Sequence, residues 1–114
     1  MLTSPDALRS GVASNTDGAS FAVIAAPGTG RKLFVSSITA VNTSAAAITV
    51  DIRDGLAGAV VWVLHVPAGG STNITFALPL GGFSENTPIC ADSSAAATTL
   101  TVSINGLRRP SNLG

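Results

Sequence analysis

Charged side chains are scarce in this chain, in which six basic and six acidic residues stand among 114 positions. Charged residues make up 11% of the chain, less than half of the roughly 25% found in an ordinary soluble domain. The formal net charge is zero, which excludes a broad positive field that would attract nucleic acid or an anionic membrane. A protein with so little charge to repel its neighbours is suited to packing against other chains.

Residues that carry metal, redox or sugar-binding chemistry are scarce as well. Cys90 is the only cysteine, so the chain is not a disulfide-stapled secreted scaffold. His65 is the only histidine, whereas zinc and iron sites and the metal-dependent cupins use several histidine or cysteine ligands. With no tyrosine and one tryptophan, the chain lacks the exposed aromatic residues of a typical carbohydrate site. We therefore expect no catalytic residues, no metal and no cofactor.

Long apolar runs are absent. The longest, from Ala59 to Leu64, is far short of the roughly 20 residues that cross a bilayer. The segment from Met1 to Pro5 has neither the basic nor the apolar region of a signal peptide. These features predict a protein made in a cytoplasm, with no membrane partner.

Short alternating runs of apolar and polar residues fill most of the chain after residue 18. In residues 48–53, 73–78 and 99–104 every second residue is apolar, which is the pattern of a half-buried strand. Glycine and proline clusters separate these runs, and no helical period is present. The predicted strands span residues 21–26, 33–41, 48–53, 59–66, 73–78, 88–91 and 99–104. The pattern predicts an all-β fold, either an antiparallel β-sandwich or a small barrel.

The chain divides into three parts by its pattern. Residues 1–18 are polar and have no strand period, and we expect an N-terminal arm there, with a disordered terminus as the alternative. Ser4-Pro5-Asp6 fits the start of a single helical turn that ends by Arg9, before Gly11. Residues 19–106 are expected to form the β-sandwich domain, and residues 107–114 a short basic tail.

The predicted strand 59–66 is apolar on both faces, unlike the others. Val60, Trp62, Leu64 and Val66 are expected in the core. Val61 and Val63 then point outward, where the arm, a second subunit or a loop would cover them. The alternative is a pair of exposed valines on an ordinary surface.

Several single residues are candidates for a role. Phe83 lies in a glycine loop, where it would plug the core, fill a pocket of a neighbour or touch a ligand. Asp51 and Arg53 are expected to form a surface ion pair, and Cys90 to be a small buried residue. His65 is expected at the surface or at an interface, and Arg108 and Arg109 against an acidic surface or in solvent. The candidate interface residues are Leu2, Leu8, Arg9, Val61, Val63, Phe83, Arg108 and Arg109.

A series of segments between Lys32 and Ile104 combines apolar strands with small-residue loops and glycine turns. In order, they are residues 32–38, 42–50, 54–55 followed by 61–62, 66–70, 80–83 and 94–104. Together they resemble the small virion proteins of tailed bacteriophages, in particular the jelly-roll-like decoration, or cement, proteins of phage heads. Residues 1–18 have no counterpart in this resemblance.

The resemblance implies a jelly-roll-like β-sandwich of about seven to eight strands that assembles on the outer capsid surface as a homotrimer. Its implied partner is the major capsid protein, whose junctions it covers so that the shell resists internal DNA pressure. It implies synthesis in the host bacterial cytoplasm and no direct contact with nucleic acid. Residues 1–18 would then reach a capsid subunit or a neighbouring protomer.

Other functions stay open at this point. Within the virion, the alternatives are a tail, fibre or head–tail connector component. A small carbohydrate- or receptor-binding sandwich is the second class. A glycosidase would need two suitably spaced carboxylates, and nothing in the pattern supports Glu85 and Asp92 in that role. We expect no enzymatic activity.

Overall fold

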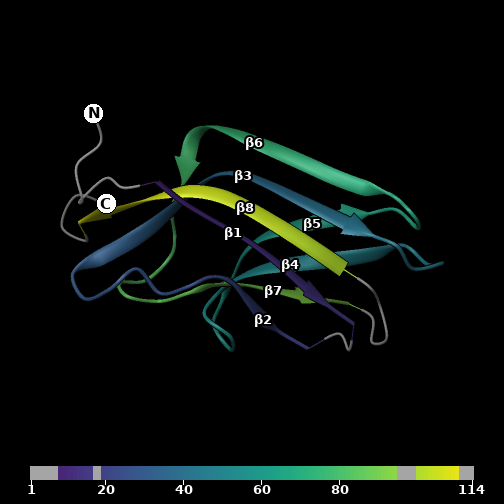
Figure 1. Cartoon of the computed structure of the whole chain (residues 1–114), viewed down its shortest axis with the longest axis horizontal. Helices are drawn as coiled ribbons and strands as arrows, with labels where there is room; N and C mark the ends of the chain where they lie inside the picture. The colour runs from purple at the N-terminus through teal and green to yellow at the C-terminus, as the bar shows by residue number, and fades with distance from the viewer. Residues whose placement is uncertain (1–7, 17–18, 95–99, 111–114) are drawn as a thin grey trace.

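The computed structural model describes residues 8–16, 19–94 and 100–110, which form eight β-strands (Figure 1). The strands are β1 (Leu8–Asn15), β2 (Phe21–Ile24), β3 (Arg31–Asn42), β4 (Ile48–Asp54), β5 (Val60–Val66), β6 (Ser71–Leu80), β7 (Ile89–Ser93) and β8 (Leu100–Pro110). Seven of them lie where the alternation predicts strands, and β1 is additional. Within these residues, no helix is long and apolar enough to cross a membrane.

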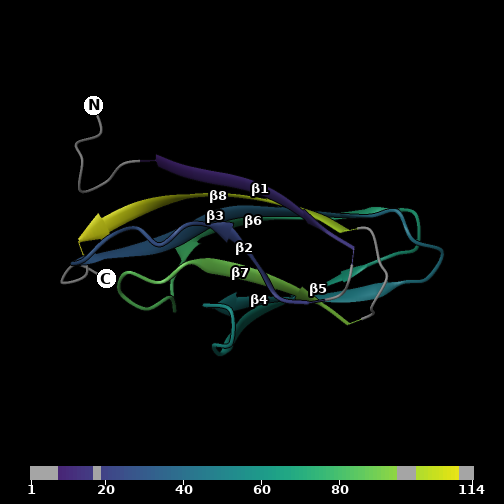
Figure 2. The same ribbon diagram turned by 60° about the horizontal axis from the view of Figure 1, so that its bottom comes forward.

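The strands form two four-stranded antiparallel sheets, which Figure 2 shows as two layers. The first sheet has the order β1-β8-β3-β6 and the second the order β2-β7-β4-β5. Among the eight described strands, only β4 and β5 are both consecutive along the chain and paired in one sheet. Two four-stranded sheets linked by crossing connections are the arrangement of a jelly roll. The predicted jelly-roll-like β-sandwich is confirmed.

β1 occupies residues that were expected to form an arm. It pairs with β8 along its whole length, from Leu8 opposite Leu107 to Asn15 opposite Leu100. The prediction that residues 1–18 lack a strand is therefore wrong for Leu8–Asn15. The helical turn is likewise wrong for Leu8 and Arg9, which lie in β1, and its earlier residues lie outside the described part of the chain.

Gly11 explains why β1 carries so little apolar signal. A β-carbon added at Gly11 would lie 1.9 Å from the carbonyl oxygen of Val23 in β2. The two sheets therefore approach each other closely at this side of the sandwich. Only small residues fit on the inner side of β1 there, so Gly11 permits a close contact between strands and does not stop a helix.

The ends of three strands differ from the prediction. β8 continues to Pro110, so residues 107–110 of the expected tail belong to the first sheet. β6 runs through Pro79, which is tolerated because β6 is an edge strand. Pro88 was expected to place its strand at an edge, but β7 begins at Ile89 and lies between β2 and β4. That prediction is wrong because Pro88 stays outside the ladder.

The core lies between the inner faces of the two sheets. Alternate residues of β3, β4 and β8 are buried there, as the sequence pattern predicts. The largest fully buried apolar side chains include Leu33, Ile38, Ile52, Ile89, Leu100 and Ile104. Phe83 enters this core from the loop between β6 and β7.

β5 contains a bulge that changes which residues face the core. Ile52 lies opposite Trp62, but the next residue, Arg53, lies opposite Val60, so Val61 is an extra residue on β5. A bulge of this kind reverses the inside–outside alternation beyond it. Val60, which was expected in the core, is 43% exposed, and Val61 is partly buried against the core instead. The prediction for Val60 is wrong for this reason.

Candidate functional site

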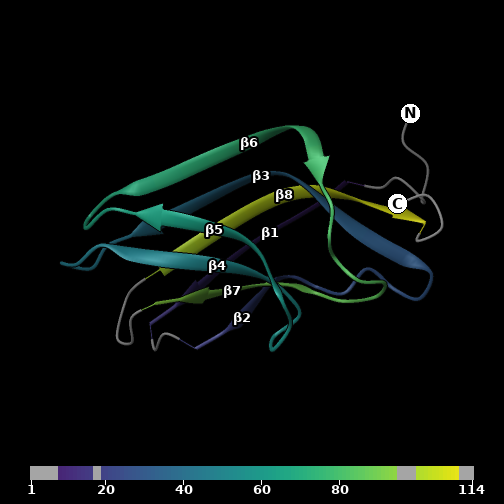
Figure 3. The ribbon, with the colours of Figure 1, turned by 180° about the vertical axis from the view of Figure 1, so that it is seen from behind.

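The two long sides of the sandwich differ. At one side β1 and β2 are in close contact, as Gly11 shows. At the other side β5 and β6 are the outer strands of their sheets (Figure 3). Each therefore has one row of backbone N–H and C=O groups that no described strand pairs. Such an edge is a template for pairing or packing with another chain.

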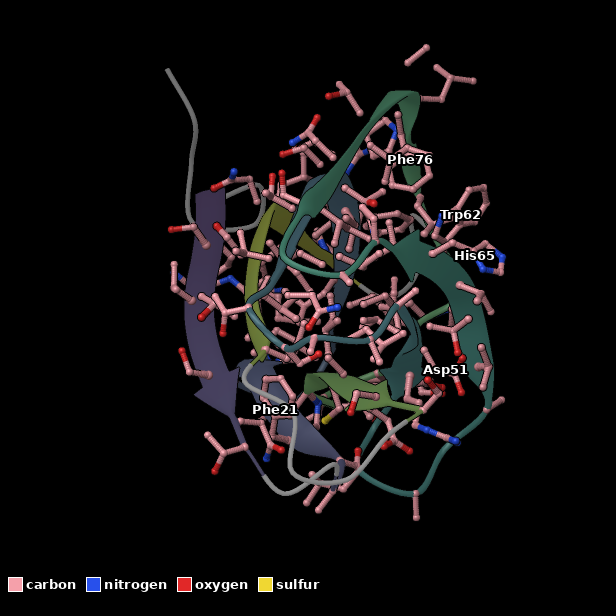
Figure 4. All side chains as sticks on the ribbon, turned by 90° about the vertical axis from the view of Figure 1, so that its right-hand side faces the viewer. Phe21, Asp51, Trp62, His65 and Phe76 are labelled. Carbon is pink, nitrogen blue, oxygen red and sulfur yellow. The ribbon has the colours of Figure 1, made fainter. Side chains whose placement is uncertain are left out.

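Aromatic rings join the two sheets at this open side. Trp62 of β5 and Phe76 of β6 pack edge to face, with ring centroids 5.1 Å apart and ring planes at 87°. Figure 4 shows both rings at the border of the sandwich. Both rings pack against the core but remain partly accessible. An aromatic pair of this geometry adds about 0.5–1.5 kcal/mol beyond its buried area.

Apolar side chains continue along both edge strands. Val63 is 45% exposed and Leu78 is 83% exposed. We call the residues along this side the β5–β6 edge surface. It comprises Val60, Trp62, Val63, Ile74, Phe76 and Leu78. Exposed apolar side chains beside an unpaired strand edge favour contact with another chain.

The chain itself covers two of the predicted interface residues. Phe83 is 3% exposed and belongs to the core, so it is not available to a partner or a ligand. Val61 is packed against the core, and a β-carbon added at Gly82 would lie 3.3 Å from its Cγ1 atom. The loop that carries Gly82 therefore covers Val61, which was one of the three coverings expected. Val63 stays outward and exposed.

The remaining interface candidates lie at the ends of the chain. Leu2 and the side chain of Leu8 are outside the described part of the structure. Arg9, Arg108 and Arg109 come together on β1 and β8, because Arg9 lies opposite Gly106. β3 adds Arg31 and Lys32, which lie opposite Pro110 and Arg109. Five of the six basic residues of the chain thus meet at one end of the first sheet.

The sixth basic residue is held among carboxylates on the second sheet. Arg53 forms ion pairs with Asp51 at 3.7 Å and with Asp92 at 3.3 Å, and its Nη1 donates to the Gly58 carbonyl oxygen at 2.9 Å. The predicted pairing of Asp51 with Arg53 is confirmed. Figure 4 shows Asp51 on the outer side of this sheet. Partly exposed pairs of this kind contribute at most about 1 kcal/mol each.

The outer face of the first sheet carries no charge along its central rows. Three rows of paired residues cross its four strands: Ser10, Asn105, Ser37 and Thr75; Val12, Ser103, Thr39 and Asn73; Ser14, Thr101, Val41 and Ser71. Hydrogen bonds link some neighbours, such as Ser14 with Thr101 at 2.9 Å. The scarcity of charge in the sequence is therefore concentrated on one face.

Asn42 is a structural residue that the pattern did not single out. Its side chain is fully buried at the end of β3. Nδ2 donates to the carbonyl oxygens of Ala46 at 2.8 Å and Pro67 at 3.1 Å. Oδ1 accepts hydrogen bonds from the N–H and the hydroxyl of Ser44, at 3.0 and 2.6 Å. The signal that could have identified it is an asparagine directly after a strand and before Thr-Ser, which favours a turn closed by the side chain.

No feature of the described residues resembles a catalytic or metal centre. They contain no group of three His, Cys, Asp or Glu side chains that could hold a metal ion. A hollow of about 420 Å³ lies beside β4 and β5. It is lined by Ala47, Ile48, Thr49, His65, Val66, Pro67 and Ser94. Without an aromatic platform or a carboxylate, this hollow does not favour sugar binding.

Cys90 is fully buried, as predicted. Burial raises the pKa of its thiol, and the negative charge of Asp54 raises it further. Because the thiolate is the reactive form, the thiol stays protonated and inert near neutral pH. We expect a thiol reagent such as a disulfide dye to label the native protein at least about tenfold more slowly than the urea-unfolded chain. Equal labelling rates would contradict this placement of Cys90.

Comparisons with solved structures identify the same fold in two kinds of assembly. A chain of the capsid of a Helicobacter pylori bacteriophage matches with a TM-score of 0.59 and 8% identity, over 89% of this chain and 87% of that chain. A chain of the disulfide-linked pili of Bacillus endospore appendages matches with a TM-score of 0.54 and 14% identity, over 92% of this chain and 89% of that chain. No protein-family model and no curated protein sequence matches. At these identities the likeness shows a shared fold.

Proposed function

We propose that this protein is a structural component of a bacteriophage particle and not a catalyst. In this proposal it binds the major capsid protein on the outer surface of the head and stabilises the shell. Copies associate with one another, and the resemblance to decoration proteins leads us to expect a trimer. A protein with this function needs a rigid fold and a large interface area, and it needs no active site.

The observation that carries the proposal is the β5–β6 edge surface. It combines two unpaired strand edges, a partly accessible Trp62–Phe76 pair and the exposed side chain of Leu78. Monomeric proteins usually protect long edges with charges, prolines or a covering segment. Among the described residues, β5 and β6 carry no Asp, Glu, Lys or Arg side chain, and Pro79, near the end of β6, is the one proline in either strand. We infer that a second copy of the chain covers this side.

The similarity to a phage capsid chain supports the proposal at the level of fold. The uncharged outer face of the first sheet supports it independently, because a low-charge face is compatible with close packing in a shell. Symmetric contacts repeated over many copies make an assembly strong even when each contact is weak.

The likeness to a Bacillus pilus chain favours a second candidate, the subunit of a filament. The pili of that similarity are disulfide-linked. In this chain the single cysteine, Cys90, is fully buried, and a buried thiol is not available to join copies. A filament built from this protein would therefore need other contacts, so we prefer the shell.

A charge placed on β5 tests the proposed contact between copies. We expect Val63→Lys to lower the oligomer mass to that of the monomer, because burial of an added charged group between subunits is costly. Within one subunit the new side chain lies opposite Asp51, so the fold is expected to tolerate it. Light scattering after size exclusion measures the mass.

Val12→Lys is the matched control for this variant. Val12 is a 69% exposed valine on β1, in the other sheet, and its replacement is expected to leave the mass unchanged. If Val63→Lys stays oligomeric, or if Val12→Lys is the variant that dissociates, the contact does not lie at β5.

Addition of the purified protein to undecorated heads of its phage tests the function itself. Co-sedimentation should reach a fixed number of copies per head, and the loaded heads should release their DNA at a higher temperature. Failure to bind expanded heads would overturn the decoration role. If the oligomer binds tails and not heads, the protein is a component of the tail and not a decoration protein of the head.

A further inference from the structure

β6 bends away from the first sheet near its end. In the ladder between β3 and β6, residues 76–79 of β6 lie opposite only Ser36 of β3. Extra residues on one strand bend it and take their side chains out of the ladder, and Figure 3 shows this sharp bend. Residues 77–79 are exposed, and Leu78 has the highest exposed fraction of the large apolar side chains in the described ranges. We call residues 77–79 (Ala, Leu and Pro) the β6 protrusion.

The hollow beside β4 and β5 presents an apolar surface. Its volume of about 420 Å³ lies within the range of roughly 300–1,000 Å³ that is usual for pockets that hold a bound group. Four of its seven lining residues are apolar, among them Ala47 and Ile48, and the others are Thr49, His65 and Ser94. The hydroxyl of Ser94 already accepts a hydrogen bond from the N–H of Thr49 at 3.0 Å. The hollow can therefore receive an apolar side chain without burying an Asp, Glu, Lys or Arg of its own.

The β6 protrusion of a chain cannot reach the hollow of the same chain. The hydroxyl of Thr72, near the start of β6, donates a hydrogen bond at 2.6 Å to the carbonyl oxygen of His65, which lines the hollow. Leu78 follows Thr72 by six positions on the same strand. At about 3.3 Å per residue the two are separated by roughly 20 Å, which is more than a leucine side chain can span. A second molecule can bring its protrusion to the hollow.

The trimer expected for this protein needs a contact between two different surfaces. In a two-fold dimer the same patch of both copies meets itself, whereas in a three-fold ring one patch of each copy meets a different patch of the next copy. The β5–β6 edge surface therefore cannot close a trimer by pairing with itself. The β6 protrusion, which includes Leu78 of that surface, and the hollow at the other end of β5 are two such surfaces, one convex and one concave.

We propose that the β6 protrusion of one copy inserts into the hollow beside β4 and β5 of the next copy, with Leu78 as the inserted side chain. The proposal rests on the association between copies proposed above and names the two surfaces that make the contact. Neither surface contains an Asp, Glu, Lys or Arg residue, so the contact buries no such charge. Transfer of an exposed leucine from water into an apolar hollow is favourable.

Two variants test the contact, one on each surface. Leu78→Asp changes the protrusion and Ala47→Glu changes the hollow, and both positions are exposed, so we expect each subunit to fold. In native mass spectrometry over a range of concentrations, each variant alone should associate at least about tenfold more weakly than the wild-type protein. Leu78→Ala, which adds no charge, should show a smaller loss of the same kind if Leu78→Asp fails to fold.

An equimolar mixture of the two variants tests whether unlike surfaces meet. The Ala47→Glu variant keeps its protrusion and the Leu78→Asp variant keeps its hollow, so one unchanged contact can form between them. We expect a species of two chains in the mixture that neither variant forms alone. If the mixture stays monomeric, or if Ala47→Glu alone is as oligomeric as the wild-type protein, the protrusion does not bind the hollow.

Val12→Asp and Ala25→Glu are the matched controls. Val12 on β1 and Ala25 directly after β2 are exposed residues on the side of the sandwich where these two strands meet. Both variants should keep the wild-type mass, and dissociation of either to the same extent as its counterpart would overturn the inference. These failures would leave the association between copies intact. A wild-type protein that is a single chain at every concentration would instead contradict the proposed function, and this inference with it.

Discussion

Replacement of Asn42 by alanine is expected to lower the free energy of unfolding by about 3 kcal/mol, a large part of the roughly 5–15 kcal/mol of a typical domain. The amide joins the loop after β3 to the loop after β5 through Ala46 and Pro67, and it closes the turn at Ser44. Alanine would remove all four side-chain hydrogen bonds and leave buried groups without partners. Each such group costs about 1–3 kcal/mol when water cannot replace the bond.

Chemical denaturation of Asn42→Ala against Asn73→Ala measures this effect. Asn73 lies on the exposed outer face, where its Nδ2 donates to the Thr39 hydroxyl, so its loss is expected to cost less than about 1 kcal/mol. If both variants lose the same small amount of stability, the buried amide does not hold the two loops together. Retention of the oligomer by Asn42→Ala would show that its effect lies in the fold of the subunit.

Gly11→Ala is expected to have a comparable effect, through steric conflict. The new β-carbon would lie 1.9 Å from the carbonyl oxygen of Val23, so β1 and β2 must move apart. Overpacking of a tight contact costs about 1–3 kcal/mol and occasionally more. In a domain of this size, a loss near the upper end of that range lowers the melting temperature by roughly 10–20 °C.

Ser10→Ala controls for the change of residue type at the adjacent, exposed position of β1. It is expected to melt within a few degrees of the wild-type protein. Limited proteolysis tests where the structure is weakened, because a protease should cleave β1 of the Gly11→Ala variant before it cleaves the rest of the sandwich. A melting temperature for Gly11→Ala equal to that of Ser10→Ala would mean that β1 does not pack against β2 as described.

The sequence predicts most of this fold because most strands carry their own pattern. β4 alternates between apolar and polar residues along its length, and β8 does so from Leu100 to Asn105, so both strands are found where the alternation predicts them, although β8 continues to Pro110. The alternation does not predict β1, because close contact with β2 requires small residues on the inner side of β1. Gly11 and Ala13 therefore occupy positions where large apolar residues would indicate a strand. The alternation does not predict the bulge at Val61 either, because the sequence of β5 alone does not show its register with β4.

Some features of the candidate sites can likewise be predicted from the sequence, and others depend on how the strands pair. The outward and exposed position of Val63 follows from the alternation of β5. The convergence of Arg9, Arg31 and Arg108 does not follow, because it needs the pairing of the first strand and the third with the last. Net charge alone conceals such a cluster. The opposite holds for Phe83, whose loop position allowed several roles until tertiary packing placed it in the core.

The jelly roll closes one side of the sandwich and leaves the other open. Contact between β1 and β2 protects two of the four sheet edges, whereas β5 and β6 keep theirs. An open side with aromatic and aliphatic side chains promotes aggregation of a monomer, whereas in an oligomer it can form the contact between subunits. This difference in the two sides is the physical basis of the proposed assembly.

The mass of the wild-type protein in solution, measured by native mass spectrometry over a range of concentrations, tests most directly whether copies associate. The chain has a mass of 11.3 kDa. We predict a species of about three times that mass, in keeping with symmetric association through a shared interface. A single-chain mass at every concentration would contradict the account, because the β5–β6 edge surface would then face water in the free protein.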